Sequence, residues 1–521
     1  MDSRRNSLEA RIAALTDSQR RAVMASDPFL CVLAGAGAGK TQVLTLRVAR
    51  MVEAGIEPEH IRVITFSRKA AQELRDRLYR FGIRGVTAST FHRVGLDLIT
   101  TAREAEHRNP PTVIGDRKGR IAQLLGKQQS AVTAAAVDAE ISWARSQGLD
   151  RMGWIDAVDH GLRRSEANLA ETSEIWARYE ELKIRSGLVD FDDLIDQATQ
   201  LLSQEQFGNA MRWRSRHLLV DEFQDLNPAQ YALLNGFLDE TSTLFCVGDP
   251  NQSIYGFAGA DPGLLSNLDQ AISHLVTINL EANHRSSPEI LAVANAVLTP
   301  DQRRPVRATQ ASEQVPEILS FATEDEEAAA VASLVRQRRA PGSHWSSIAV
   351  LARTNYQLET IATALRTARI PVRELGGDTS PGSDLQAGAR PAATSEEDGV
   401  VLSTFHKAKG LEWPHVVVVG VADGLVPHAN VNDVAGLLEE RRLLYVALTR
   451  AERDLTITWA QRRSAHAPIR QRSGFLDEVE LVIRHLRAEE AGGASARGAM
   501  RIAQIRAELQ ERQEKSNTTG A

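Results

Sequence analysis

The stretch AGAGAGKT at residues 34–41 decides the fold of this chain. It follows an apolar run at residues 29–33 and precedes a helical pattern at residues 42–50. A strand, a glycine-rich turn and a helix in this order predict a P-loop, in which backbone N–H groups hold phosphates at the positive end of the helix. Lys40 would then reach the β- and γ-phosphates, and Thr41 would hold Mg²⁺. The strict pattern begins with Gly rather than Ala, and a flexible Gly/Ala turn is the alternative, but Gly-Lys-Thr at the correct offset favours a nucleotide site.

A second signal of phosphate chemistry is HLLVDEFQD at residues 217–225. An apolar strand that ends in two acids is typical of a Walker B element. In such an element Asp221 would bind Mg²⁺ through its water shell and Glu222 would polarise the attacking water. Many strands end in acids only for solubility, so this motif alone is a weak signal. Together with the P-loop it predicts an ATPase site.

A third apolar run, residues 243–247, leads into the loop GDPNQSIYGF at residues 248–257. Its two aromatic residues, Tyr255 and Phe257, suit stacking on nucleic-acid bases, which tolerates any base sequence. Aromatic rings that fill a hydrophobic core are the alternative interpretation.

The length and composition predict a soluble protein of several domains. A chain of 521 residues is too long for one core and should hold two to four domains, and 43% hydrophobic with 25% charged residues is ordinary for globular proteins. We expect no signal peptide and no membrane span, because the N-terminal segment is polar and no apolar run is long enough. Cys31 and Cys246 lie in apolar runs, so we expect buried side chains without metal or disulfide roles. The net charge of −6 neither suggests nor excludes a nucleic-acid partner, since one cleft can be basic on an acidic protein.

Strand-like runs alternate with helical patterns along most of the chain, which predicts an α/β fold with doubly wound parallel sheets. The runs in the first half are residues 29–33, 61–66, 218–220, 244–247 and 276–280. The runs in the second half are residues 318–321, 348–351, 400–403, 416–419 and 455–459. Residues 101–188 interrupt the first alternation with helical spacing. The acidic segment after Val189 is expected to cap and solvate a helix start.

These motifs resemble those of the UvrD/Rep/PcrA family of superfamily 1 DNA helicases. Further segments resemble the remaining motifs of the family, in the family's order. They are residues 15–20 for the Q motif, 64–71 for motif Ia, 89–92 for the next DNA-contact motif, 280–287 for motif IV, 402–412 for motif V and 439–451 for motif VI. The resemblance therefore runs from about residue 15 to about residue 480.

The resemblance implies two RecA-like P-loop domains with one ATP in the cleft between them. The first domain (1A) would comprise residues 1–100 and 189–278, with a helical insertion (1B) at residues 101–188. The second (2A) would comprise residues 279–485, and residues 486–521 would form a disordered tail. The family's large 2B insertion is absent, and residues 374–399, rich in Gly, Ala, Ser and Pro, would form a short linker in its place.

The resemblance also implies residues for catalysis and nucleotide binding, with ATP and Mg²⁺ as cofactors. The catalytic residues would be Lys40, Asp221, Glu222, Gln252, Arg285 and Arg450, and Thr41 and Asp221 would hold the metal. The nucleotide would be surrounded by Gln19, Ala34, Gly35, Ala36, Gly37, Ala38, Gly39, Lys40, Thr41, His284, Arg285, Glu412 and Arg450. Two positions depart from the family pattern. His284 stands where a tyrosine normally stacks on the adenine, and Ala258 stands where an arginine normally follows the aromatic pair.

The function implied is an ATP-dependent 3′–5′ DNA helicase or translocase on single-stranded DNA, used in DNA repair or replication. DNA contacts would come from Phe66, Thr90, His92, Tyr255, Phe257, Arg353, Asn355, Thr404 and His406. Single-stranded DNA and its junctions with duplex would be the partners, in a cytoplasmic, nucleoid-associated bacterial monomer. The alternative is a translocase that displaces proteins and unwinds duplex only with a partner protein. A non-hydrolysing scaffold is disfavoured, because it predicts loss of Lys40, Glu222 or Arg450 and all three are present.

Overall fold

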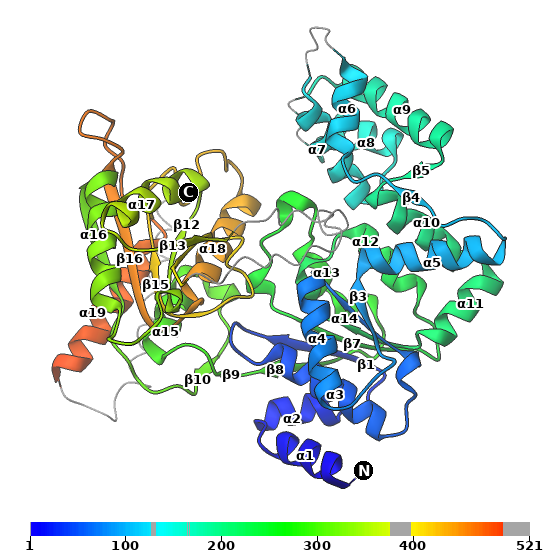
Figure 1. Cartoon of the computed structure of the whole chain (residues 1–521), viewed down its shortest axis with the longest axis horizontal. Coiled ribbons are helices and arrows are strands. Elements are labelled where there is room, and N and C mark those ends of the chain that lie inside the picture. The colour runs from blue at the N-terminus through cyan, green and yellow to red at the C-terminus, as the bar shows by residue number, and fades with distance from the viewer. Residues whose placement is uncertain (1, 127–131, 164, 166, 376–397, 493–521) are drawn as a thin grey trace, which may run out of the picture. The chain divides into compact units, whose positions relative to one another are not determined.

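The computed structural model describes residues 2–126, 132–163, 165, 167–375 and 398–492 (Figure 1). These residues divide into two compact units, each described here by itself. Unit 1 holds residues 2–35 and 39–281, and unit 2 holds residues 36–38 and the described chain from Ala282 onward.

A six-stranded parallel sheet in the order β3-β2-β6-β7-β1-β8 forms the centre of unit 1. Its strands are β1 (Phe29–Ala34), β2 (Ile61–Thr65), β3 (Thr87–Thr90), β6 (His217–Val220), β7 (Thr243–Gly248) and β8 (Val276–Leu280). The five strands predicted for this half are confirmed. The edge strand β3 was not predicted, because Thr-Ala-Ser-Thr is short and polar. Cys31 and Cys246 are buried at paired positions of β1 and β7.

Helices cover this sheet and position the loops at the carboxyl ends of its strands. The helices that share a buried core with the strands are α5 (Phe91–Ala105), α10 (Phe191–Ser203) and α12 (Pro228–Gly236). Those that contact one another in the N-terminal part are α1 (Asp2–Ala13), α2 (Asp17–Met24), α3 (Lys40–Glu53) and α4 (Arg68–Arg80).

Residues between α5 and α10 form a helical insertion with its own core around Trp154, Trp176 and Tyr179. Its helices are α6 (Arg117–Leu125), α7 (Ala134–Ser146), α8 (Arg151–Asp159) and α9 (Leu169–Ser186). Two short parallel strands, β4 (Thr112–Val113) and β5 (Leu188–Val189), pair at its base. Residue 101, the predicted start of the insertion, lies inside α5, which continues to Ala105 on the helical spacing of its buried residues.

Unit 2 contains a second six-stranded parallel sheet, in the order β11-β16-β15-β12-β14-β13. Its strands are β11 (Glu317–Thr323), β12 (Ile348–Ala352), β13 (Val372–Glu374), β14 (Val400–Thr404), β15 (Trp413–Val418) and β16 (Ala451–Arg462). Its main helices are α15 (Pro288–Val297), α16 (Glu324–Arg338), α17 (Asn355–Thr367), α18 (Val434–Leu448) and α19 (Leu476–Gly492). The five predicted strands are confirmed, whereas the three-residue edge strand β13 was not predicted.

Two sequence predictions concern the ends of this unit. The predicted end of the ordered domain at residue 485 is wrong, because α19 continues to Gly492 through Leu486, Arg487, Ala488, Glu489 and Glu490, all good helix formers. The rest of the predicted tail, residues 493–521, lies outside the described residues. The same is true of residues 376–397, which are most of the predicted linker.

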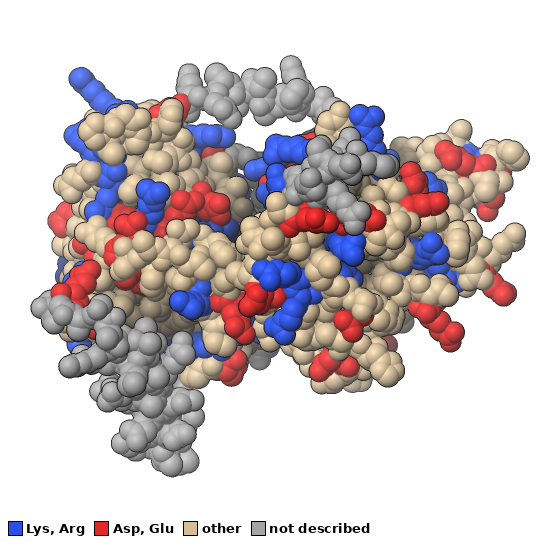
Figure 2. Space-filling model, turned by 90° about the horizontal axis from the view of Figure 1, so that it is seen from below, with Lys and Arg blue, Asp and Glu red and all other residues tan. Residues whose placement is uncertain are grey.

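Among the described residues, no helix combines the length and the apolar character needed to cross a membrane. Lys and Arg side chains lie interspersed with Asp and Glu over the face seen in Figure 2.

Candidate nucleotide and DNA sites

The glycine-rich loop after β1 has the backbone geometry of a P-loop. Gly37 and Gly39 have positive φ angles of 70° and 77°, a conformation that side chains disfavour, and Gly39 is the N-cap of α3. A Cβ atom on Gly39 would lie 2.9 Å from Gln19 Nε2, so the predicted base-reading glutamine lies against the loop. Lys40 begins α3 and its Nζ donates a hydrogen bond to Ala34 O at 3.4 Å. The loop therefore brings Gln19, Lys40 and the N-terminus of α3 together.

The two acids predicted for metal and water follow β6 directly. Asp221 N donates to Ile64 O (2.9 Å) and Glu222 N donates to Asp221 Oδ1 (3.0 Å). Burial, with a smaller contribution from Glu222, raises the pKa of Asp221 to about 7, and Lys40 acts in the opposite direction. Glu222 has a φ of 52°, an uncommon value for a residue with a side chain, which re-aims its carboxylate at the strand end. A buried carboxylate beside a lysine and a phosphate loop suits a Mg²⁺–nucleotide complex.

A chain of hydrogen bonds leads from Glu222 to Gln252. Gln224 Nε2 donates to Glu222 Oε2, and Gln224 Oε1 accepts from Asp249 N at 2.9 Å. Asp249 Oδ2 in turn accepts from Gln252 Nε2 at 2.6 Å. Gln224 and Asp249 were not predicted as site residues, although both lie inside the motifs read from the sequence. Both residues are buried, and through them hydrogen bonds join the Glu222 carboxylate to the loop that carries Tyr255 and Phe257.

Unit 2 contains the predicted arginines and the residues around them. Asn283 Nδ2 donates to Ala36 O (2.7 Å), and Asn283 Oδ1 accepts from Arg285 N (2.9 Å). Arg285 Nε donates to Glu412 Oε2 at 2.6 Å, so these two predicted residues pair with each other. His284 Nδ1 lies 3.0 Å from Thr309 Oγ1. Asn283 was not predicted, because no local sequence pattern identifies an asparagine whose side chain binds a backbone carbonyl far away in the sequence.

Arg450 is buried, with only 1% of its surface exposed. Its Nε donates to Val446 O (2.9 Å) and its Nη1 donates to Leu411 O (3.0 Å).

Three aromatic rings predicted to contact DNA form a series in unit 1. Phe66 stacks on Tyr255 with ring centroids 5.0 Å apart, and Tyr255 lies 6.0 Å from Phe257. Tyr255 is only 7% exposed, whereas Phe257 is 69% exposed. Phe257 is therefore the ring of this series that is open to a base.

The other two predicted DNA residues of unit 1 lie at the start of α5. Thr90 is the N-cap of this helix and its Oγ1 accepts from Arg93 N at 3.4 Å. His92 lies edge-on to Phe191 of α10, with ring centroids 5.8 Å apart.

The predicted DNA residues of unit 2 lie at the carboxyl ends of β12 and β14. Arg353 follows β12 and makes a two-pronged ion pair with buried Glu440, with Nη2 at 2.7 Å from Oε1. Asn355 is the first residue of α17, and Thr404 is the last residue of β14. Burial, followed by the charges of Arg353 and Lys409, lowers the pKa of His406 to about 4, so this ring is neutral at pH 7. Glu440 was not predicted as a site residue.

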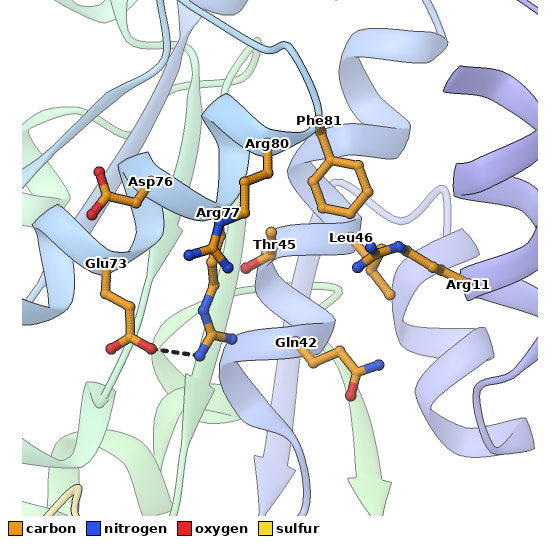
Figure 3. A pocket seen from close by; sticks show the side chains of 9 residues that line it. All are labelled: Arg11, Gln42, Thr45, Leu46, Glu73, Asp76, Arg77, Arg80 and Phe81. Carbon is orange, nitrogen blue, oxygen red and sulfur yellow. Dashed lines mark hydrogen bonds and ion pairs between the residues drawn. The ribbon is translucent and has the colours of Figure 1, made fainter. Parts of the chain in front are cut away.

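A pocket of about 380 Å³ between α1, α3 and α4 was also not predicted (Figure 3). It lies beside Gln42, the residue after Thr41, and three arginines reach into it. Arg11 lies over the ring of Phe81 at 5.0 Å, and Arg77 pairs with Glu73 at 2.5 Å. Its arginines are thus partly engaged within the protein.

The sequence matches two domains of one helicase family. The UvrD/REP helicase N-terminal domain matches residues 15–273, and the UvrD-like helicase C-terminal domain matches residues 278–379 and 384–462. This chain belongs to the UvrD/Rep helicase family.

Several relatives of this family are similar over most of the chain. ATP-dependent DNA helicase UvrD2 of Mycobacterium tuberculosis is 29% identical over 95% of this chain and 85% of its own length. DNA helicase II of Escherichia coli is 32% identical over 70% of this chain and 52% of its own length. ATP-dependent DNA helicase Rep of Escherichia coli is 25% identical over 87% of this chain and 92% of its own length. The UvrD/Rep match thus takes in the P-loop, the two acids, the aromatic series and the arginines of unit 2.

Proposed function

We propose that this UvrD/Rep-family protein is an ATP-dependent helicase and translocase that moves 3′ to 5′ on single-stranded DNA. The observation that carries the proposal is the chain of hydrogen bonds through Glu222, Gln224, Asp249 and Gln252 in unit 1, in which Asp249 contributes both its backbone N–H and its carboxylate. It connects the carboxylate placed to activate water with the loop of exposed Phe257. Through this connection, DNA bound at the loop would affect the Glu222 carboxylate and thereby the rate of ATP hydrolysis. The names of the relatives, ATP-dependent DNA helicases among them, support the same function.

For the nucleotide, the residues of unit 1 have distinct roles. The loop glycines and Lys40 would bind phosphates, and Gln19 beside Gly39 would read the base edge. Mg²⁺, when bound by Thr41 and Asp221, would neutralise phosphate charge. Glu222 would orient and deprotonate the attacking water. In unit 2, Arg285 and Arg450 would stabilise the charge of the transition state, an effect worth about 10³–10⁵ in rate for an arginine finger.

For DNA, stacking and backbone contacts would act together. Phe257 offers an exposed ring, and base stacking does not depend on sequence. His92 and His406 would add polar contacts near the strand ends, and Thr90 and Thr404 hold the starts of the segments that carry them. We propose single-stranded DNA and junctions as substrates, in DNA repair or in processing linked to replication.

One set of assays tests this function. ATP hydrolysis is measured with and without single-stranded DNA, and strand displacement is measured on duplexes with a 3′ tail and with a 5′ tail. We expect DNA-stimulated ATPase and displacement of the 3′-tailed duplex. An ATPase that is indifferent to DNA contradicts the proposal, and displacement of only the 5′-tailed duplex reverses the direction.

A translocase that displaces proteins but unwinds poorly alone is the second candidate, and one observation favours it. Strands β13 and β14 are adjacent and parallel, and only residues 375–399 connect them. The alignment with UvrD2 spans 599 positions although this chain has 521 residues, so the relative holds residues that this chain lacks. Removal of streptavidin from biotinylated single strands, without displacement of the tailed duplex, would select this candidate.

A further inference from the structure

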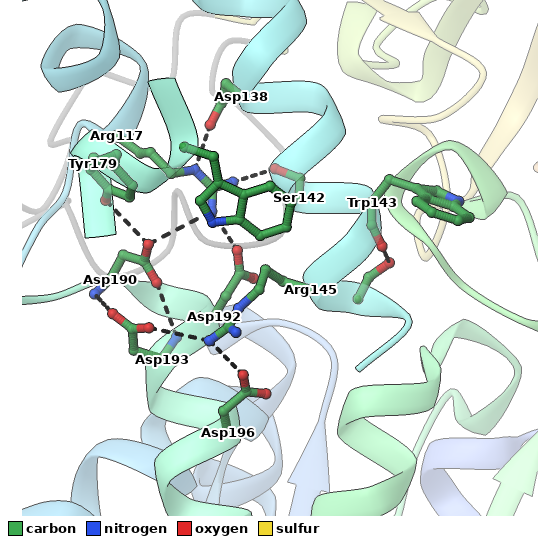
Figure 4. Close-up of polar contacts among 12 residues, drawn as sticks. Arg117, Asp138, Ser142, Trp143, Arg145, Tyr179, Asp190, Asp192, Asp193 and Asp196 are labelled. Carbon is green, nitrogen blue, oxygen red and sulfur yellow. Dashed lines mark hydrogen bonds and ion pairs between the residues drawn. The ribbon is translucent and has the colours of Figure 1, made fainter. Parts of the chain in front are cut away.

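The helical insertion of unit 1 is fixed to α10 by a cluster of buried charges (Figure 4). Lys183 of α9, only 3% exposed, pairs with Asp190 (3.1 Å) and with Asp193 (2.7 Å). Arg145 of α7 pairs with Asp193 (3.2 Å) and Asp196 (2.5 Å). Arg117 of α6 pairs with Asp192.

Three cations from three helices of the insertion thus meet the aspartates of one helix. Buried ion pairs contribute little net stability compared with apolar packing, but they tolerate only one arrangement of their partners. The cluster therefore fixes where α7 lies on α10.

The carboxyl end of α7 meets the loop that carries Phe257. Gly259 ends this loop with a φ of +87°, and a Cβ atom there would lie 2.0 Å from Ser146 Oγ and 2.5 Å from Ser146 Cβ. Gln147 Nε2 donates to Gly259 O at 3.4 Å. Ser146 is itself held, because its Oγ donates to Trp143 O at 2.6 Å. Helix α7 and the loop are in contact so close that no side chain fits between them.

Within the loop, backbone hydrogen bonds couple the position of Gly259 to that of Phe257. Ala258 N and Ala260 N both donate to Tyr255 O, at 2.9 Å and 3.1 Å, so residues 255–260 form one hydrogen-bonded turn. A displacement of Gly259 must therefore displace Phe257 or break this turn. The same α10 that anchors α7 also carries Phe191, which contacts His92.

We propose that α7 of the helical insertion positions the aromatic loop 255–259 for single-stranded DNA, with Arg145 as its anchor on α10 and the contact of Ser146 with Gly259 as the point of action. Ser146, Gly259 and Arg145 are positioning residues in this scheme. The inference rests on the proposed function, because it assumes that Phe257 contacts DNA. The helical insertion would thus contribute to DNA-dependent ATP hydrolysis through the contact between α7 and loop 255–259, which lies inside unit 1.

Gly259→Ala tests the contact, and the readout is the DNA concentration that gives half-maximal ATPase. An added methyl forces the loop and α7 apart, so we expect this concentration to rise about tenfold while the rate at saturating DNA changes by less than about threefold. Gly55→Ala is the matched control, because Gly55 has a φ of +93° and open space where its Cβ would lie. It imposes similar backbone strain without a contact, so its half-saturating DNA concentration should equal that of the parent.

Removal of the obstructing side chain should rescue the variant. Ser146→Gly combined with Gly259→Ala frees the space, and we expect half-saturation to return to within about threefold of Gly55→Ala. If Gly259→Ala behaves like Gly55→Ala, or if Ser146→Gly gives no rescue, α7 does not position the loop.

A second pair of variants acts at the anchor and remains informative if Gly259→Ala does not fold. Arg145→Met should raise the half-saturating DNA concentration, and Arg145→Lys should restore it in part because a cation again faces Asp193 and Asp196. Equal values for both variants and the parent would overturn the proposal. A failure of the proposed function is distinct, since the parent protein itself would then show no DNA-stimulated ATPase.

Discussion

In the proposed site, Lys40 would hold the phosphates of ATP and Glu222 would activate the water that hydrolyses it. Lys40 lies at the start of α3 and, in the proposed site, contacts only phosphate. Lys40→Ala should therefore abolish ATP hydrolysis while binding of single-stranded DNA is retained. Glu222→Gln should bind ATP with the parent's affinity and lose turnover by about 10²–10⁴-fold, as expected for a general base. Nucleotide binding by fluorescence and steady-state ATPase assays measure both effects, and a Glu222→Gln rate within a few-fold of the parent would exclude the general-base role.

Phe257 and Tyr255 belong to one aromatic series, but they differ in exposure. We therefore expect their alanine variants to lose different properties, DNA affinity in one case and thermal stability in the other. Phe257→Ala should weaken binding of single-stranded DNA by about 1–3 kcal/mol with little change in Tm, because the ring is 69% exposed and a base can stack on its exposed part. Tyr255→Ala should lower Tm, since this ring is 7% exposed and packs on Phe66. Fluorescence anisotropy and thermal melting measure the two quantities. Equal losses of affinity for both variants without any change in Tm would show that exposure does not distinguish their roles.

At the scale of elements, the sequence predicts the strands and helix caps that depend on residues close together along the chain. The ten predicted strands were found because each contains an apolar run, whereas short strands such as β3 and β13 at the sheet edges were missed. The aspartates after Val189 were correctly expected to cap α10, since Asp190 accepts from Asp193 N. The prediction that these aspartates are solvated was wrong, because Asp190 and Asp193 are only 3% and 8% exposed.

What could not be predicted are partners distant in sequence. Arg117 and Arg145 meet the aspartates of α10 only through the tertiary fold, and the same holds for Glu440 beside Arg353 and for Asn283 beside Ala36. No local pattern records such pairs.

The buried charges of α10 predict a dependence of stability on pH. Burial and the neighbouring Asp190 raise the pKa of Asp193 from 3.8 to about 6, against the opposing effect of Lys183. A raised pKa in the folded state means that this group stabilises fully below pH 3.8 and that its contribution is lost as pH rises through 6. Arg145 and Lys183 face Asp193 as cations, whereas Asp190 faces it as an anion.

Asp193→Asn should remove this dependence. The free energy of unfolding of the parent, relative to the variant, should fall by about 1–3 kcal/mol between pH 4 and pH 7. Urea unfolding of both proteins at the two pH values measures this difference. A relative stability that rises over this range would mean that Lys183 and Arg145 lower the pKa of Asp193 instead.

At the scale of the molecule, net charge and DNA affinity need not agree. The chain carries a formal charge of −6, with cations and anions interspersed on the face seen in Figure 2. Binding of single-stranded DNA should nevertheless weaken as salt rises, because each phosphate contact releases counterions and contributes about −0.7 to the slope of log K against log salt. Anisotropy titrations over a series of salt concentrations give this slope. A slope near zero would mean that stacking alone binds the strand.

The connection between β13 and β14 gives the last prediction. These strands are adjacent and parallel, with Val372 opposite Val400, and residues 375–399 join them. Their composition is that of a linker, so deletion of residues 382–393 should leave DNA-stimulated ATPase within about twofold of the parent. The remaining connection is long enough, because an extended chain spans about 3.3 Å per residue and needs only to return along a short strand. If ATPase is lost while thermal melting is unchanged, these residues are a working part of the motor, and the proposal that the family's 2B insertion is replaced by a simple linker is wrong.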